Sequence, residues 1–410
     1  MNHVIIGASA AGLNAAKTLR RRDPSAVITV VSKDTHVYSR CMLHLYIAGA
    51  RDVERLTFVS DDFFDKQDIR WEKGVSVTGV DFDQKTVALD NGKTLSYDKL
   101  LIATGSEASI PPIEGLRGAK NVFKVRHLED AEQIKQYAQT SKRAVVIGAG
   151  LIGLDVASAL LRQGASVSLV EMGDRLLPRQ LDEKAAAAYQ SLFERAGAVF
   201  HLGAAVKGAV TVDGAVTAIR LGDGSELLVD FVVVAAGVRA QTGFIEDERL
   251  KVERGVVTDD RMRTSVPDVY AAGDVTGRSA IWPQAVKQGI VAANNMAGFD
   301  RRLDDNFTAK NAINLLGLQT ISVGLADAPD DSYHVVSLQD AHTYKKLIFK
   351  DDQIHGALLQ GDLAGAGFWT QLVKDSLSVN TSVRDLFSES YADFFQIDEK
   401  GRFSFAHRAD

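Results

Sequence analysis

The stretch RAVVIGAGLIGLDVASALL, Arg143–Leu161, decides the fold of this 410-residue chain. It begins with a short run of β-branched residues, turns at closely spaced glycines and continues with the apolar spacing of a helix. The same order stands near the start of the chain in HVIIGASAAGLNAAKTL, His3–Leu19. Two strand–turn–helix units are therefore predicted, one at each of these places.

Each unit is followed by a similar second half. After the first, TVALDNGKTLSYDKLLIATG reads as a strand, a turn at Asn91-Gly92, another strand and Gly105. After the second, VTAIRLGDGSELLVDFVVVAAG reads as a strand, a turn at residues 222–224, a strand and Gly237. The chain thus contains two copies of one domain plan. Because strands and helices alternate in both copies, we expect an α/β fold with a parallel sheet in each.

Composition excludes several classes of function. The formal net charge of −6 is spread over both signs, so there is no basic stripe for nucleic acid. The longest apolar tract, Ala144–Leu154, is too short to span a membrane. The start of the chain lacks a basic leader, so we expect no signal peptide. With one cysteine and no intrachain disulfide, the cytoplasm is the expected compartment. The sequence predicts no metal site.

The glycine turns predict dinucleotide binding. Glycine at such a turn permits the sharp bend, lets the backbone approach a pyrophosphate and lets the helix pack closely on the strand. The second turn is complete, with Gly148, Gly150 and Gly153, and Glu171 stands at the end of the next strand. A carboxylate there accepts a hydrogen bond from a ribose 2′-hydroxyl and repels a 2′-phosphate. NADH is therefore favoured over NADPH.

The first turn departs from this pattern. It reads Gly7, Ser9 and Gly12, so a small serine replaces the middle glycine. At the end of the following strand, Ser32 stands where an acidic residue is usual, and Asp34 follows two residues later. The turn still suits a phosphate, and which of the two side chains reaches a ribose is left open.

A third signal comes late in the chain, in TSVPDVYAAGDVTG, Thr264–Gly277. An apolar strand ends there in Gly273-Asp274, which places a carboxylate beside a close-approach glycine at the carboxyl edge of a sheet. Ligands bind at this edge in α/β folds. A sugar-alcohol hydroxyl suits the carboxylate of Asp274.

Taken together, GASAAG, LLIATG, GAGLIG with Glu171, VVVAAGV and VYAAGDV resemble the FAD-dependent pyridine nucleotide-disulfide oxidoreductase family. The resemblance covers about residues 1–300 in the right order. It implies two Rossmann-like domains, the NAD domain being inserted into a discontinuous FAD domain. The implied boundaries are 1–112 and 241–300 for the FAD-binding domain, 113–240 for the NAD(H)-binding domain and 301–410 for a C-terminal α+β interface domain.

The resemblance also implies the binding residues. It places FAD along the first motif and Asp274, and NADH on the second motif. The expected cofactor-binding positions, beyond the glycines and acidic residues named above, are Ala10, Ala11, Lys33, Arg40, Ala103, Thr104, Leu151 and Ile152. Asp155 holds the place of an acidic residue that lies near the nicotinamide in this family, one methylene shorter than the usual glutamate.

Cys41, the only cysteine, lies in YSRCMLHLYIAG. This stretch resembles the redox-cysteine segment of coenzyme A disulfide reductases, NADH oxidases and NADH peroxidases, and a helix N-terminus beside Arg40 would lower the thiol pKa. It also resembles the Tyr-Ser-Arg-Pro-Leu-Leu segment of NADH:rubredoxin reductases and of the flavoprotein part of NADH nitrite reductases, which work without that cysteine. His44 is a candidate proton donor. Because Ala10 replaces the histidine of the oxidases and peroxidases, those activities are disfavoured.

The remainder of the chain reads as strands with a turn near Asp351-Asp352, followed by the amphipathic helix GFWTQLVKDSL. Such a tail resembles the interface domain of the same reductases and suggests a possible homodimer. The expected function is an FAD-dependent NADH oxidoreductase that passes hydride to FAD. Its electrons then leave either through Cys41 to a disulfide or persulfide, or directly to an electron-carrier protein. A flavin-based redox sensor is the alternative of another class.

Overall fold

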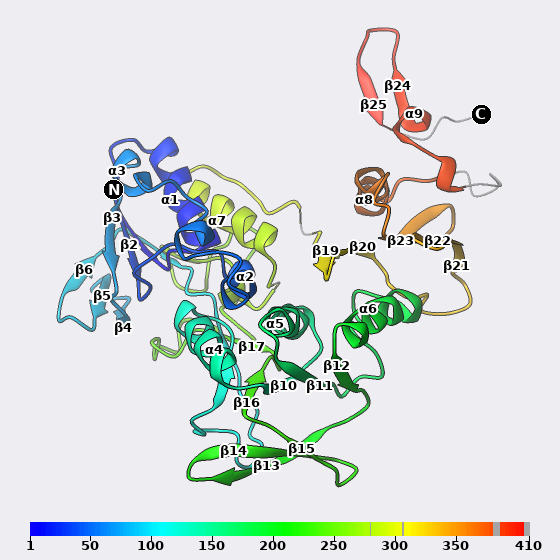
Figure 1. Cartoon of the computed structure of the whole chain (residues 1–410). Helices are drawn as coiled ribbons and strands as arrows, with labels where there is room; N and C mark the ends of the chain where they lie inside the picture. The colour runs from blue at the N-terminus through cyan, green and yellow to red at the C-terminus, as the bar shows by residue number, and fades with distance from the viewer. Residues whose placement is uncertain (279, 306, 380–385, 406–410) are drawn as a thin grey trace. The chain divides into compact units, whose positions relative to one another are not determined.

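The computed structural model describes residues 1–278, 280–305, 307–379 and 386–405. The chain forms two compact units, each made of several segments (Figure 1). The first unit contains residues 1–111, 123–137 and 235–308, and the second contains residues 112–122, 138–234 and 309–410.

A parallel sheet forms the centre of the first unit. Its order is β18-β7-β1-β2-β3, and each neighbouring pair runs parallel. The strand bounds are β1 (Asn2–Ile6), β2 (Val27–Ser32), β3 (Arg70–Lys73), β7 (Lys99–Ile102) and β18 (Val269–Ala271). Because β1 has β2 on one side and β7 on the other, the strand order reverses at β1, which is where α/β sheets open a ligand crevice.

Both faces of this sheet are covered. Side chains alternate along β1, so that Ile5 packs toward α1 (Ala10–Arg22) and α7 (Trp282–Met296). Val4 and Ile6 pack in the other direction, in a core cluster shared with the three-stranded antiparallel sheet β4-β5-β6. Those strands are β4 (Val77–Asp81), β5 (Thr86–Leu89) and β6 (Thr94–Ser96), and the turn between the last two contains the predicted Asn91-Gly92.

A close backbone contact joins the end of β1 to the end of β7. A Cβ built on Gly7 would lie 2.2 Å from the carbonyl oxygen of Ala103, and the φ of Gly7 is +119°. Both facts exclude any other residue at this position. The helix α1 begins three residues later, after the N-cap Ser9, so the turn predicted from GASAAG is confirmed.

The second unit contains a parallel sheet of the same plan. The strands β10 (Arg143–Ile147), β11 (Ser166–Val170), β12 (Ala198–His201) and β16 (Phe231–Val234) pair in parallel in the order β12-β11-β10-β16. Two helices belong to this part, α5 (Leu151–Arg162) and α6 (Glu183–Arg195). A separate antiparallel sheet consists of β13 (Val206–Val212), β14 (Ala215–Leu221) and β15 (Glu226–Leu228). Both predicted strand–turn–helix units are thus observed.

The C-terminal part of the second unit is an antiparallel sheet with one helix. The order β19-β20-β23-β22-β21 comprises β19 (Lys310–Leu315), β20 (Leu318–Gly324), β21 (His334–Gln339), β22 (Tyr344–Lys350) and β23 (Gln353–Gln360), followed by α8 (Ala366–Asp375). The predicted turn at Asp351-Asp352 is confirmed. Its two residues have φ values of +49° and +59°, as a two-residue turn of type I′ requires.

The remaining elements are one further helix of 13 residues, α4, and several short segments. They are η1 (Arg40–Met42), α2 (Leu43–Ile47), η2 (Glu54–Leu56), α3 (Phe63–Lys66), β8 (Ser106–Ala108), β9 (Val122–Lys124), α4 (Leu128–Thr140), β17 (Val238–Ala240), η3 (Asp274–Thr276), η4 (Leu386–Ser388), α9 (Tyr391–Phe394), β24 (Phe395–Ile397) and β25 (Phe403–Phe405). Within the described part of the chain, no helix has both the length and the apolar character that a membrane span needs. The three domain boundaries expected from the sequence stay a prediction, and residues 306, 380–385 and 406–410 of the last domain lie outside the described residues.

The contact of α7 with α1 predicts a steric limit at Gly289. A Cβ built there would lie 2.2 Å from the carbonyl oxygen of Ala11, so Gly289→Ala forces the two helices apart. We expect a loss of about 1 to 3 kcal/mol in the free energy of unfolding, measured by denaturation followed by circular dichroism. Gly79→Ala is the control, because a Cβ on Gly79 meets no described atom within 4 Å. Equal stability of the two variants would contradict this packing.

Candidate functional site

A pocket in the first unit opens at the carboxyl edge of β1, β2 and β7. It brings together the first glycine turn, the end of β2, the segment after β7 and the Gly273-Asp274 pair. The predicted site residues that line it are Gly7, Ser9, Ala10, Ala11, Ser32, Lys33, Asp34, Arg40, Cys41, Ala103, Thr104, Gly105, Gly273 and Asp274. Segments far apart in the sequence therefore meet where the motifs predicted a nucleotide.

The glycine turn of this pocket is packed closely against the start of α1, which leaves no space for a side chain at Gly12. A Cβ on Gly12 would lie 1.9 Å from the carbonyl oxygen of Gly7, so the turn and the start of α1 are in direct backbone contact. The backbone N–H groups at the start of α1 are left to a ligand, as a pyrophosphate requires. The turn therefore fits a dinucleotide.

Asp274 is oriented by two donors. The guanidinium Nη2 of Arg126 donates to its Oδ2 at 2.8 Å, and the hydroxyl of Ser106 donates to the same oxygen at 3.1 Å. Arg126 also donates through Nε to the carbonyl of Ser106 at 2.8 Å. The sequence did not reveal Arg126, although it lines the pocket, because it follows β9 in a segment that carries no recognisable motif.

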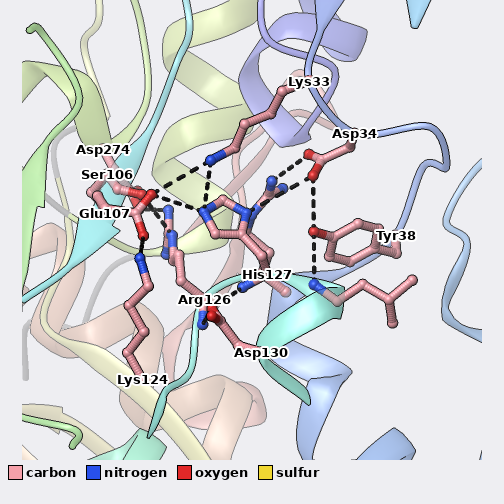
Figure 2. A network of polar contacts seen from close by, with 12 residues as sticks. Lys33, Asp34, Tyr38, Ser106, Glu107, Lys124, Arg126, His127, Asp130 and Asp274 are labelled. Atoms are coloured by element: carbon pink, nitrogen blue, oxygen red, sulfur yellow. Dashed lines mark hydrogen bonds and ion pairs between the residues drawn. The ribbon is translucent and has the colours of Figure 1, made fainter. Parts of the chain in front are cut away.

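Asp34 belongs to a polar network shown in Figure 2. Its carboxylate accepts a hydrogen bond from Arg40 at 2.5 Å and one from the Tyr38 hydroxyl at 3.1 Å. That hydroxyl in turn accepts the backbone N–H of Leu128, the first residue of α4, at 3.2 Å. Burial alone would raise the pKa of the Asp34 carboxyl, but His127 and Arg40 together hold that pKa well below its usual range. Asp34 is therefore ionised.

His127 lies between two carboxylates in the same network (Figure 2). Its Nε2 is 2.9 Å from Glu107 and its Nδ1 is 3.8 Å from Asp34. Burial would lower the pKa of His127, yet the two carboxylates outweigh burial and raise it. Lys33 lies 3.1 Å from Nε2, and Lys124 pairs with Glu107. The sequence analysis did not identify His127 or Glu107 as site residues, because neither lies in a motif and their partners come from other segments of the chain.

The side chains at the carboxyl end of β2, Ser32 and Asp34, form hydrogen bonds within the chain. The Ser32 hydroxyl donates to the carbonyl of Asp34 at 2.9 Å and accepts the indole N–H of Trp71 at 3.0 Å. The Asp34 carboxylate faces Arg40, Tyr38 and His127. Both candidates for the ribose position are thus tied within the chain, and their role toward a ribose stays a prediction.

Cys41 is exposed and lines the pocket. It lies in the 3₁₀ turn η1, and the following helix, α2, begins at Leu43 and has only five residues. The Arg40 guanidinium, which we expected to act on the thiol, is directed at Asp34 instead. His44 lies in the first turn of α2 and is half-buried, and among the described residues it is not part of the pocket lining.

The second glycine turn lies in the second unit. Gly148 follows β10, Gly150 is the N-cap of α5, and Leu151, Ile152 and Gly153 form its first turn. The carboxylate of Glu171 accepts the backbone N–H of Ala149 at 2.8 Å and that of Gly173 at 2.8 Å. The carboxylate therefore lies at the turn, as expected from the sequence. Around it the side chains of Ile152 and Met172 are 44% and 77% exposed, an apolar surface without cover in the described chain.

Two further predicted residues are not among those that line the pocket. Asp155 is half-buried on α5, and burial raises the pKa of its carboxyl to about 7. Gly237 connects β16 to β17 with a φ of +103°. Apart from His44, Asp155 and Gly237, the predicted residues thus fall into two groups, the pocket of the first unit and the glycine turn of the second. Among the described residues, no cluster of three or more acidic, histidine or cysteine side chains is arranged to hold a metal.

A family model described as pyridine nucleotide-disulphide oxidoreductase matches residues 1–289. The chain belongs to this family. A second model, described as the rubredoxin NAD⁺ reductase C-terminal domain, matches residues 310–376. The family predicted from the motifs, and the α/β fold class with a separate C-terminal domain, are thereby confirmed.

Individual members of the family show how widely this plan is used. The chain is 33% identical over 90% of its length to the NADH-dependent phenylglyoxylate dehydrogenase subunit epsilon of Aromatoleum evansii, of which it covers 91%. It is 33% identical over 82% of its length to the assimilatory nitrate reductase electron transfer subunit of Bacillus subtilis, of which it spans only 44%. The structure of a NAD-dependent persulfide reductase from A. fulgidus superposes with a TM-score of 0.83 at 28% identity, covering 92% of this chain and 77% of that one.

The network around His127 predicts that the contribution of this histidine to the stability of the protein depends on pH. A histidine whose pKa is raised on folding stabilises the protein below its unfolded-state pKa of about 6.5, and this contribution is lost as the pH rises through the folded-state pKa. The melting temperature of His127→Gln should therefore fall furthest below that of the wild type near pH 6, and the gap should narrow toward about pH 9. His36→Gln, which changes an exposed histidine of the same unit, is the control. A gap that widens with pH would contradict the ion-pair network.

Proposed function

We propose that this chain is an FAD-dependent NADH oxidoreductase, with FAD in the pocket of the first unit and NADH at the glycine turn of the second. The observation that carries this proposal is the duplicated turn, each copy built at the carboxyl edge of its own parallel sheet. A single turn serves one dinucleotide, and two turns in one chain suit an electron transfer between two dinucleotides. Family membership supports the same assignment.

Residues of the first pocket have distinct parts in this proposal. FAD supplies the acceptor for a hydride and releases the electron pair to a further acceptor. The N–H groups after Gly7 bind the pyrophosphate, and the Gly7–Gly12 contact brings the backbone close enough to do so. Asp274 accepts a hydrogen bond from a sugar-alcohol hydroxyl, and Arg126 and Ser106 hold its carboxylate in position.

Residues of the second turn bind and select the coenzyme. Glu171 accepts a hydrogen bond from a ribose 2′-hydroxyl and repels a 2′-phosphate, which favours NADH. The exposed side chains of Ile152 and Met172 offer apolar cover for an adenine ring. Asp155 is the proposed residue at the nicotinamide, and with a pKa of about 7 its carboxyl takes up or gives off a proton near neutral pH.

We propose two alternative routes by which electrons leave FAD for a final acceptor. In the first, the thiolate of Cys41, exposed in the pocket, would attack one sulfur of a small disulfide or persulfide and release the other sulfur as a thiolate or hydrosulfide, leaving a mixed disulfide on Cys41. Bound FAD would supply the two electrons that return Cys41 and its partner sulfur to thiolates. The likeness to a persulfide reductase supports this route. In the second, electrons pass to a carrier protein without cysteine chemistry, and the match of residues 310–376 to the C-terminal domain of rubredoxin reductases supports it. A homodimer, the cytoplasm as location and His44 as proton donor are parts of the same proposal.

A substitution in the second glycine turn tests whether NADH and FAD bind at different places. A Cβ built on Gly150 meets no described atom within 4 Å, so Gly150→Asp fits the fold and places a negative charge where a pyrophosphate would bind. We expect this variant to keep FAD and to lose NADH oxidation by about 100-fold or more, measured with ferricyanide as acceptor. The matched control is Gly164→Asn, which changes a glycine at the far end of α5 that also has open space. Retained NADH oxidation in Gly150→Asp would reject the assignment.

Cys41→Ser distinguishes the two routes. In an anaerobic NADH titration, a redox-active thiol gives a long-wavelength thiolate-to-flavin band and takes up more electrons than the serine variant. Identical titrations would remove Cys41 from the chemistry and leave the carrier-protein route.

The same preparations separate an enzyme from a redox sensor. The enzyme should reduce ferricyanide or a dye rapidly with NADH, whereas a sensor should be slow with every artificial acceptor.

A further inference from the structure

We propose that Asp327 is a specificity-determining residue for the coenzyme: by pairing with Arg175 it withholds that cation from the 2′-phosphate that distinguishes NADPH from NADH. The inference rests on the proposed NADH site and adds to it a contribution from the C-terminal part of the chain. Arg175 is the first cationic residue after Glu171, and the two belong to one segment, residues 171–177, which we name the coenzyme loop.

The backbone of the coenzyme loop is tied to the glycine turn on both sides of Arg175. The N–H of Gly173 donates to the Glu171 carboxylate at 2.8 Å, and the other oxygen of that carboxylate accepts from Ala149. The N–H of Leu177 donates to the carbonyl of Ala149 at 3.4 Å. A cation at position 175 therefore starts from a backbone fixed beside the site. In a Rossmann site such a cation is the group that accommodates a 2′-phosphate.

The side chain of Arg175 is directed elsewhere. Its Nη2 forms an ion pair with the Asp327 carboxylate and also lies 3.4 Å from the carbonyl oxygen of Pro178, while Nε donates to the carbonyl of Leu181 at 3.4 Å. The Arg175 side chain is 27% exposed in this arrangement. Its charge is thus matched by a carboxylate, and its donors are divided among three acceptors.

Asp327 is itself held by a buried lysine. The ammonium of Lys346 lies 3.3 Å from Asp327 and donates to the carbonyl of Ala326 at 2.8 Å and to Asp182 at 3.0 Å. Tyr344 donates its hydroxyl to the same Asp182 at 2.6 Å. Both Lys346 and Asp182 are buried. A buried ammonium is costly without carboxylate partners, so this cluster keeps Asp327 in place whether or not Arg175 is present.

Because Lys346 holds Asp327 in place, the Arg175–Asp327 ion pair costs less conformational entropy than an isolated surface pair. An isolated surface pair is worth little, because holding two long side chains costs conformational entropy. Here the carboxylate is already fixed, and Arg175 is the only member that has to be ordered. Glu171 repels a 2′-phosphate, and the Arg175–Asp327 pair removes the cation that would offset this repulsion. Both features act in the same direction, toward NADH.

Asp327→Asn tests the inference. The amide keeps the shape of the side chain and removes the charge that holds Arg175, which can then form charge-assisted hydrogen bonds to a phosphate. We expect the ratio of kcat/KM for NADPH to kcat/KM for NADH, with ferricyanide as acceptor, to rise by about fivefold to tenfold, mainly through a lower KM for NADPH. The Kd of NADP⁺ for the oxidised holoprotein, measured by calorimetry, should fall by a similar factor. Asp327→Ala should give the same rise.

Three controls identify the cause. Asp331→Asn removes a negative charge from the same connection without touching Arg175, and should leave the ratio as in the wild type. Asp327→Glu keeps a carboxylate and should also leave NADPH use low. In Asp327→Asn/Arg175→Gln the gain should disappear, because the released cation is gone.

The inference is overturned if folded Asp327→Asn keeps the wild-type ratio and NADP⁺ affinity, or if Asp331→Asn gains as much. It is also overturned if the gain survives in the double variant. Failure of the proposed function has a different signature, since the wild type itself would then bind no NAD⁺ and oxidise no NADH.

Discussion

The contact between the end of β1 and the end of β7 is the constraint on which the first unit depends. Gly7 approaches Ala103 so closely that no side chain fits between the two segments. The contact occurs where the strand order reverses, so it fixes the crevice and at the same time exposes the N–H groups that start α1. The segment after β7 and the Gly273-Asp274 pair are positioned relative to the turn through this one contact and the parallel strands beside it.

Ion pairs and hydrogen bonds hold the segment between β2 and α2, in addition to the packing of Val37 on the core. Asp34 pairs with Arg40 and accepts the Tyr38 hydroxyl, and His127 bridges toward Glu107. The segment that carries Cys41 is thereby fixed at one end by an ionised cluster and at the other by a helix of only five residues. The Asp34 carboxylate, which the motif offers as a candidate for the ribose, also pairs with side chains of the chain at the edge of the pocket. Position along the chain does not distinguish these two roles, since both require an acidic residue after β2.

The features predicted correctly from the sequence are those that depend on the conformation of a few neighbouring residues. The glycine turns, the parallel strands and the hairpin at Asp351-Asp352 follow from backbone conformations that few residues adopt, so they are readable in the sequence. Arg126 and His127 were not readable, because their roles depend on partners 148 and 20 residues away. The helix expected after Cys41 is present, but it has only five residues, Leu43–Ile47. The direction of the Arg40 side chain was missed because Asp34 competes for it.

The first unit is assembled from three separated segments of the chain, so it cannot be completed until the last of them has been synthesised. Its sheet includes β18, and α1 packs on α7, although Ala10 and Met296 lie at opposite ends of the sequence of that unit. During translation α1 therefore leaves the ribosome long before α7, the helix on which it packs. The parallel sheet β12-β11-β10-β16, whose strands all lie within residues 143–234, is complete earlier. The later copy of the domain plan can therefore complete its sheet before the earlier copy, whose sheet includes β18 and whose helix α1 packs on α7.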